Sequence, residues 1–198
     1  AQRFRLLLRV RTQAMLRRYL SLLLSYLLCQ LSLGCAYYNT FYNAKRAYSQ
    51  AMKEKDRSPT QKAPPAVLDK CIERCGKLIQ LHPNSGWVDD AMLLMGKCYH
   101  EKGEYSKALS IFDKIPVYYP GSPLLQEAYF MKGESYLKQG DYLAAVAAFQ
   151  AAGALGGDLE EESCLKVAES HIAGQEYEDA AAAARRFLLD HPKSRLRA

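Results

Sequence analysis

The stretch that decides the fold is DDAMLLMGKCYHEKGEYSKALSIFDKIPVYYP, residues Asp89 to Pro120. Its first half places apolar and small residues at the spacing of one helix face, namely Met92, Met95, Gly96 and Tyr99. After a break at Gly103 the same spacing returns in a second set, Tyr105, Ala108, Phe112 and Ile115. The stretch therefore predicts two amphipathic helices that fold back on each other at Gly103, with Pro120 ending the second.

This pattern recurs in register along the chain. One further copy has the same residue types at the equivalent positions, which are Gly133, Tyr136, Gly140, Tyr142, Ala145 and Phe149. A weaker copy replaces the glycine with Ala168 and the aromatic with His171, and its second helix continues through Tyr177, Ala180, Ala184 and Phe187 to Pro192. Half a copy precedes them all, with Leu68, Cys71, Cys75 and Leu78 as its second helix.

The repeated unit resembles the tetratricopeptide repeat (TPR), a helical hairpin of about 34 residues with a Leu-Gly, aromatic, Ala, Phe and Pro pattern. The resemblance implies an all-α fold, a TPR-type α-solenoid of stacked antiparallel helical hairpins. We expect these hairpins at about residues 38–83, 87–120, 124–157 and 160–192. An unrelated helical bundle is the alternative, but it would have to explain three copies in register.

A Pro-x-Ser sequence follows the second helix of three of the expected hairpins. The three sequences are His82-Pro-Asn-Ser85, Tyr119-Pro-Gly-Ser122 and His191-Pro-Lys-Ser194. Because a serine hydroxyl can accept a hydrogen bond from the first turn of a helix, we expect each serine to act as an N-cap.

The beginning of the chain has the features of an exported protein. The chain starts with Ala1, and its first methionine is Met15. From there a short basic segment, an apolar run and small residues lead to a boundary at Cys35, as in a secretory signal peptide. We expect residues 15–34 to be a lipoprotein signal peptide, residues 1–14 a non-native upstream extension, and residues 35–198 the TPR-like domain. The apolar run is too short and too interrupted for a comfortable transmembrane helix.

Gly34 followed by Cys35 resembles the lipobox of bacterial lipoproteins. The resemblance implies that Cys35 is acylated and becomes the mature N-terminus. Ala36 follows the cysteine in place of the aspartate that favours inner-membrane retention, so the resemblance implies an outer-membrane lipoprotein facing the periplasm. A secreted protein cut near Gly34 without lipid, and a signal anchor, remain the alternatives.

Charge is unevenly distributed along the chain. The formal net charge is +6, and the side chains before Cys35 that are charged at pH 7 are all arginines, namely Arg3, Arg5, Arg9, Arg11, Arg17 and Arg18. The rest of the chain is therefore close to neutral, which argues against nucleic acid as a partner because such binding needs a basic folded face.

After Cys35, apolar and small residues recur at the spacing of one helix face, namely Phe41, Ala44, Tyr48 and Ala51. This spacing predicts a helix that starts a few residues after the acylated cysteine. The segment Lys53 to Pro65 is rich in proline and charge, and we expect it to be a loop.

Four cysteines remain once the leader and Cys35 are set aside, namely Cys71, Cys75, Cys98 and Cys164. Cys71 and Cys75 occupy small core positions of the repeat, so we interpret them as buried apolar thiols. A disulfide and a zinc site are the alternatives.

The sequence contains none of the common catalytic or cofactor motifs, such as GxSxG, HExxH, the P-loop or the Rossmann fingerprint. The four histidines His82, His100, His171 and His191 fall in turns, at a packing position and on a helix face. Glu160 to Glu162 suits the start of a helix. We therefore expect no enzyme activity, cofactor, metal or small-molecule substrate.

Stacked hairpins offer a binding surface. By analogy with TPR proteins, the first helix of each repeat lines the inner surface of the array. The analogy places candidate partner-binding residues between the core positions, namely Asp90, Leu93, Lys97, His100, Glu127, Phe130, Glu134, Leu137, Glu162, Leu165 and Glu169. Their mixture of acidic and apolar types suits an extended segment or helix of a protein partner, although some could only contact neighbouring helices. We interpret Trp87, the single tryptophan, as a packing anchor rather than a binding hot spot.

The chain ends at Ala198, shortly after a Pro-x-Ser turn that normally leads into another helix. We therefore expect a truncated C-terminus.

The lipid anchor, the repeats and the Pro-x-Ser turns together resemble the TPR lipoproteins of the outer-membrane β-barrel assembly machinery, the BamD-like family. More loosely they resemble CpoB-like periplasmic TPR proteins, which coordinate envelope constriction. The resemblance implies an anchored, periplasm-facing scaffold for protein partners in barrel assembly. An adaptor for peptidoglycan, cell-division or secretion machinery is one alternative, and a non-catalytic subunit of an envelope enzyme or transport complex is another.

Overall fold

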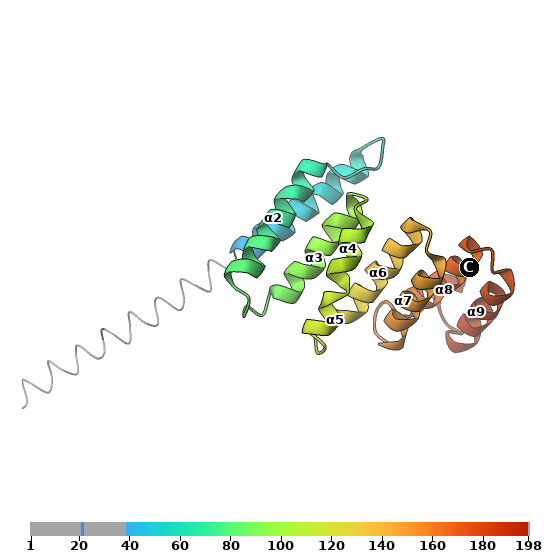
Figure 1. Cartoon of the computed structure of the whole chain (residues 1–198). Coiled ribbons are helices and arrows are strands. Elements are labelled where there is room, and N and C mark those ends of the chain that lie inside the picture. The colour runs from blue at the N-terminus through green and yellow to red at the C-terminus, as the bar shows by residue number, and fades with distance from the viewer. Residues whose placement is uncertain (1–20, 22–38, 198) are drawn as a thin grey trace, which may run out of the picture. The chain divides into compact units, whose positions relative to one another are not determined.

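The structure is a computed structural model that describes residue 21 and residues 39–197. The chain divides into two units, Ala1–Thr40 and Phe41–Ala198. The predictions for residues 1–14, residues 15–34 and Cys35 therefore lie outside the described residues. The second unit holds the repeats, and its helices appear in Figure 1.

Helices are the only regular secondary structure that the described part of the chain contains. Residues 39–57 are helical and are followed by α2 (Pro65–Leu81). The next hairpin consists of α3 (Val88–Glu101), α4 (Tyr105–Phe112) and α5 (Lys114–Tyr118). Then come α6 (Leu125–Gln139) with α7 (Tyr142–Ala154), α8 (Glu160–Ala173) with α9 (Tyr177–Asp190), and the short 3-10 helix η1 (Arg195–Arg197).

Most helices pack against the helices next to them in the chain. The closest pairs are α2 with α3, α3 with α4, α6 with α7, α7 with α8, and α8 with α9. The helix α4 also packs against α6 and so links the second hairpin to the third (Figure 1). Because contacts join neighbouring hairpins, the unit is a stacked array. The predicted fold class is confirmed.

The glycine and phenylalanine of the repeat touch each other. Gly96 of α3 lies against the ring of Phe112 in α4, and Gly133 of α6 lies against Phe149 in α7. A methyl group at Gly133 would lie 2.7 Å from Cε1 of Phe149, closer than two carbon atoms can approach without a shift. The glycine therefore lets the two helices of a hairpin pack around the phenylalanine ring.

The turns inside the hairpins adopt a left-handed backbone conformation. Gly103 has φ of 76° and Gly140 has φ of 80°, values that glycine adopts without steric cost. In the last hairpin Gln175 takes the equivalent position with φ of 64°. A side chain in this conformation is unfavourable, so the last hairpin departs from the repeat at its turn as well as at Ala168.

Two predicted elements differ from the structure. The second helix of the second hairpin is split at Asp113 into α4 and α5, because Pro116 has no N–H to donate to the carbonyl of Phe112. The loop expected over Lys53 to Pro65 starts only at Ser58, so residues 53–57 extend the helix. An ion pair of 2.7 Å between Lys55 and Glu101 of α3 holds this extension.

The serines of the Pro-x-Ser turns do not cap the following helices, so the N-cap prediction was wrong. The N-cap residues of α3 and α6 are Trp87 and Leu124, and neither makes a side-chain capping bond. The hydroxyl of Ser122 instead accepts from the N–H of Leu124 and donates to Asp89 Oδ2 over 2.6 Å. These bonds fold the turn and tie it to the preceding hairpin.

The same tie recurs in the later hairpins. Ser194 Oγ donates to Glu161 Oε2 over 2.7 Å, and Glu161 occupies in α8 the position that Asp89 occupies in α3. In α6 that position is Gln126, whose side-chain amide donates to the carbonyl of Gly156. In α3, α6 and α8, a polar residue in the first turn therefore forms a hydrogen bond with the turn that follows the same hairpin.

The core consists of two clusters. The first runs from Phe41 to Ala128 and includes the fully buried Leu68, Leu78, Phe112 and Ile115. The second is smaller and comprises Ala145, Val146, Phe149 and Val167. In the described residues, no helix is both long enough and apolar enough to cross a membrane.

Candidate protein-interaction surface

The candidate residues from the sequence lie on α3, α6 and α8, which are the first helices of three successive hairpins. We call them the first-helix face, defined by Asp90, Leu93, Lys97, His100, Glu127, Phe130, Glu134, Leu137, Glu162, Leu165 and Glu169. Ion pairs connect several of them from one hairpin to the next. The structure therefore brings side chains from the three helices together.

The first connection joins α3 and α6. Lys97 forms an ion pair with Glu127, and both side chains are partly shielded from solvent. Beside them, Asp90 is half-buried, and burial together with the charge of Asp89 raises the pKa of the Asp90 carboxyl. The charges of Lys97 and Glu127 therefore neutralise each other, and the ionised form of Asp90 is disfavoured. Few unpaired charges remain on this part of the face for a partner to bind.

The second connection joins α6 and α8. Lys166 Nζ lies 3.3 Å from Glu134 Oε1 and 2.8 Å from Glu169 Oε2. Burial acts to lower the pKa of Lys166, but the hydrogen bond to Glu169 and the nearby charge of Glu134 outweigh it, so the pKa is raised. The ammonium group therefore stays charged between two carboxylates. Lys166 was not among the sequence candidates, because it occupies the repeat position that is apolar in the other copies, as Leu94 and Met131.

His100 forms a further connection between α3 and α6. Its Nδ1 lies 2.9 Å from Ser135 Oγ of α6, and that hydroxyl donates to the carbonyl of Met131 over 2.8 Å. The imidazole Nδ1–H is thus the donor to the serine oxygen. Burial lowers the pKa of His100, so the ring is neutral near pH 7.

Three of the apolar candidates pack against the core, one of them buried and two of them partly buried. Leu93 is only 4% exposed and belongs to the first core cluster, so its expected exposure was wrong. Phe130 packs edge-on against Phe149 with ring centroids 5.4 Å apart, and Leu137 also packs against the second cluster. These positions face neighbouring helices because each first helix is covered on two sides, by its own hairpin and by the adjacent one.

The open part of the first-helix face lies on α8. Glu162 and Glu169 are exposed, and Leu165 between them is partly exposed. A carboxylate, an apolar side chain and a second carboxylate therefore lie at i, i+3 and i+7 along one helix. This short stripe keeps the chemistry that the sequence suggested for the whole face.

One hollow in the second half of the array was not expected from the sequence. It has a volume of about 690 Å³ and is lined by residues of α7, α8 and α9. Phe149, Val167 and Phe187 supply apolar walls, whereas Asp179 and Asp190 add acidic groups. Small side chains on both flanking helices, such as Gly153 and Ala183, make the room. The run of alanines from Ala180 to Ala184 in α9 was the signal for it that the sequence contained.

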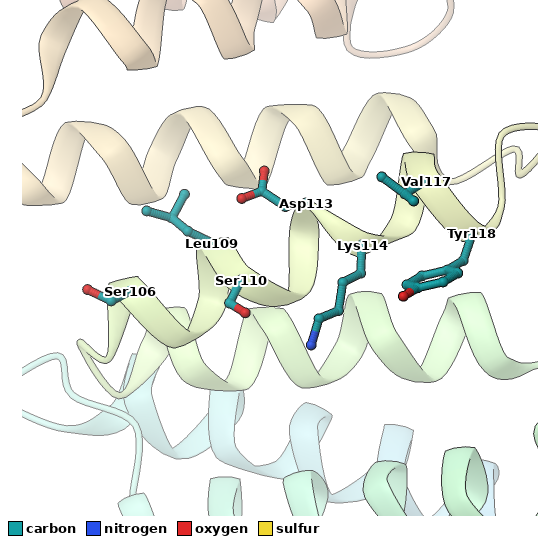
Figure 2. A pocket seen from close by; sticks show the side chains of 7 residues that line it. All are labelled: Ser106, Leu109, Ser110, Asp113, Lys114, Val117 and Tyr118. Carbon is teal, nitrogen blue, oxygen red and sulfur yellow. The ribbon is translucent and has the colours of Figure 1, made fainter.

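A second hollow of about 520 Å³ lies along α4 and α5. Figure 2 shows that its lining side chains come from these two helices and from Asp113 between them. Leu109, Asp113 and Val117 form one row along them, and Asp113 pairs with Lys132 of α6 over 2.6 Å. Because a single helix pair lines it, this hollow is a depression on the surface rather than a cleft between hairpins.

One group of possible metal ligands comes together within the described range. The ligand atoms of His171, Glu176 and Asp179 lie within 4.8 Å of one another, and His171 Nδ1 lies 2.7 Å from Glu176 Oε2. Glu176 and Asp179 also stand at the start of α9, where the helix dipole favours acidic side chains. An imidazole–carboxylate pair at a helix start therefore accounts for the group.

The cysteines also cluster. Cys71, Cys75 and Cys98 are buried free thiols that meet between α2 and α3. Hydrogen bonding with Cys71, followed by burial, raises the pKa of both Cys75 and Cys98, so these two remain protonated. Their position in the first cluster agrees with the interpretation of buried apolar thiols.

The chain is a stacked array of helical hairpins, and ion pairs join their first helices. This is the architecture of a TPR protein-interaction scaffold, which is a non-catalytic class of protein. Residues 123–158 and 163–194 each match a family model described as tetratricopeptide repeat. Residues 42–140 match the family model YfiO, described as outer membrane lipoprotein. Since that match spans half of the sequence, the chain belongs to this family of outer membrane lipoproteins. Among curated proteins, none matches the chain significantly.

Solved structures show the same fold. A crystal structure of MamA is 24% identical, with a TM-score of 0.53 over 64% of this chain and 70% of that one. The apo form of RapI is 12% identical, with a TM-score of 0.59 over 79% of this chain and 44% of that one. At these identities the likeness concerns the fold alone.

Proposed function

We propose that the protein is a lipid-anchored, periplasm-facing scaffold that holds a protein partner on the first-helix face, within the assembly of outer-membrane β-barrel proteins. The observation that carries the proposal is the cross-hairpin pairing of Lys97 with Glu127 and of Lys166 with Glu134. These pairs hold α3, α6 and α8 in a fixed arrangement before any partner arrives. A preorganised surface loses less conformational entropy on binding. Acylation of Cys35 supplies the anchor.

The open stripe of α8 indicates the chemistry of the partner. Glu162 and Glu169 flank Leu165, so a matching segment carries basic side chains around an apolar one. Opposite charges at the rim of an interface mainly speed association and select the partner, and the apolar contact adds affinity. Family membership supports an envelope protein as the source of that segment.

The test reverses the two open carboxylates in the acylated full-length chain. We expect Glu162→Lys with Glu169→Lys to lose the cross-links that the native chain forms with barrel-assembly proteins in native membranes. Glu134 is left unchanged because its ion pair with Lys166 joins two hairpins, whereas the ion pair between Glu169 and Lys166 lies within α8. The matched control is Glu178→Lys, which reverses an exposed first-turn carboxylate of α9, away from the stripe.

Other outcomes identify other roles. Cross-links to cell-wall or secretion proteins would replace barrel assembly with an adaptor role. A single stoichiometric enzyme or transporter would indicate a non-catalytic subunit. Unchanged capture by the double variant would contradict the first-helix face and move the site to the hollow over α8.

A further inference from the structure

The end of the first hairpin carries an exposed aromatic and apolar surface. Trp87, which precedes α3, packs against Phe41 with ring centroids 5.3 Å apart, yet it remains 41% exposed. Leu81, the last residue of α2, is 65% exposed. The indole therefore has one face fixed by Phe41 and another open to the surroundings. The sequence interpretation of Trp87 as a packing anchor describes only the first of these.

These residues lie at the same end as Phe41, in the first turns of the helix over residues 39–57. That helix and α2 run antiparallel, joined by the loop over residues 58–64, and Arg74 of α2 donates to the carbonyl of Asn43 over 2.8 Å. The start of the first helix and the end of the second thus lie together. Lys45 Nζ lies 5.6 Å from the centroid of the Phe41 ring, so a positive charge lies next to the Phe41–Trp87 pair.

The length of chain before this end limits its distance from an anchor at Cys35. Phe41 follows Cys35 by six residues. A fully extended chain spans at most about 3.6 Å per residue, so Phe41 can lie no more than about 22 Å from the acylated cysteine. This step rests on the anchor in the proposed function. With that anchor, the Trp87 end is the part of the hairpin array that the chain keeps nearest to the bilayer.

We propose that the surface formed by Leu81, Trp87 and Lys45 rests on the phospholipid headgroups of the membrane that holds Cys35. Tryptophan is enriched at the interface between lipid and water, because its ring is apolar and its N–H is polar. An exposed leucine adds apolar area, and a lysine suits anionic headgroups. The contact would be a second membrane signal beside the acyl chains, and it would fix which end of the array faces the bilayer.

The single tryptophan makes the contact directly measurable. The acylated full-length chain is reconstituted in vesicles of phosphatidylethanolamine and phosphatidylglycerol, with and without bromine on the acyl chains. Bromine quenches indole fluorescence only at short range. We expect Trp87 emission to shift to the blue on reconstitution and to lose much of its intensity in brominated vesicles.

A matched pair of variants tests the surface. Leu81→Ser should weaken the quenching, because it removes apolar contact at the membrane end. Leu143→Ser should leave it unchanged, since Leu143 is 67% exposed but lies in the first turn of α7, at the other end of the hairpins.

Two failures can be told apart by the mass of the N-terminal peptide. A chain without acyl groups on Cys35 would overturn the anchor and this inference together. An acylated chain whose Trp87 emission ignores bromine would overturn the inference alone. A blue shift that appears only when envelope proteins are added, without quenching by bromine, would likewise overturn it by assigning the surface to a protein.

Discussion

The two halves of the array use the same glycine–phenylalanine contact but fill the space around it differently. Up to α5, the core contains bulky side chains that are fully buried, such as Leu68, Leu78 and Ile115. From α6 to α9, Phe149 is the largest fully buried side chain among the described residues. Hydroxyl groups are also buried there, on Ser135, Ser163 and Ser170. The hollow of about 690 Å³ lies in this second half.

The repeat pattern therefore determines which helices pair, whereas the residues around the glycine–phenylalanine contact determine how closely the side chains of each hairpin pack. A filled hairpin is costly to perturb, because close-packed side chains cannot adjust. A hairpin with a hollow and small residues has room to adjust or to accept a ligand. Four comparisons of variants separate the two halves.

The largest expected effect concerns the two phenylalanines. We expect Phe112→Ala to lower the free energy of unfolding by about 3–5 kcal/mol, the usual cost of removing a buried phenylalanine. Phe149→Ala should cost less, because its ring borders the hollow and the surroundings can relax. Urea unfolding of both variants measures the difference. A larger loss for Phe149→Ala would contradict the comparison.

Added volume should have opposite effects in the two halves. Ala108 is fully buried beside Phe112, so Ala108→Leu should destabilise the fold by about 1–3 kcal/mol through overpacking. Ala183 lines the hollow, so Ala183→Leu should raise the stability by about 1 kcal/mol through added apolar burial. Thermal unfolding monitored by circular dichroism gives the sign of each change. Equal destabilisation by both would show that the second half is as tightly filled as the first.

The buried hydroxyls of the second half differ in their partners. Ser163 Oγ is buried without a hydrogen-bond partner, whereas Ser135 Oγ bonds to His100 and to the carbonyl of Met131. We expect Ser163→Ala to stabilise the fold by about 1 kcal/mol and Ser135→Ala to destabilise it by a similar amount. Equilibrium unfolding in urea checks both. Loss of stability in Ser163→Ala would reveal a bond to water or to a ligand.

The smallest effect is the pH dependence of the contact between the halves. Burial lowers the pKa of His100 in the folded state, below the ordinary value of 6.5. As the pH falls below about 6.5, the unfolded chain takes up a proton that the folded chain does not, so stability decreases until the folded pKa is passed. We expect His100→Gln to make this decrease shallower between about pH 7 and 5. An unchanged slope would mean that His100 does not contribute.

The fold could be predicted well because the repeat is defined by the spacing of residues that lie close together in the sequence. Glycine, aromatic and proline positions recur in register, and each has a direct physical role in a turn or a close contact. The departures came from single residues that act against the pattern. Pro116 splits α4 from α5, and the Lys55–Glu101 ion pair extends the first helix past the expected boundary.

The candidate surface was predicted less well. Spacing shows which residues share a helix face, but it does not show which neighbours cover that face. Leu93 and Phe130 satisfy the spacing and still pack inward, because adjacent hairpins meet there. The pairing of Lys166 between Glu134 and Glu169 and the hollow over α8 depend on contacts between hairpins, which no single repeat encodes.

The most direct test of the account is photo-cross-linking from two leucines of the acylated chain in native membranes. A cross-linking amino acid replaces Leu165 on the first-helix face in one variant, and the 79% exposed Leu189 of α9 in the other. The account predicts a defined adduct with a barrel-assembly protein from position 165 and none from position 189. An adduct formed only from position 189 would contradict it.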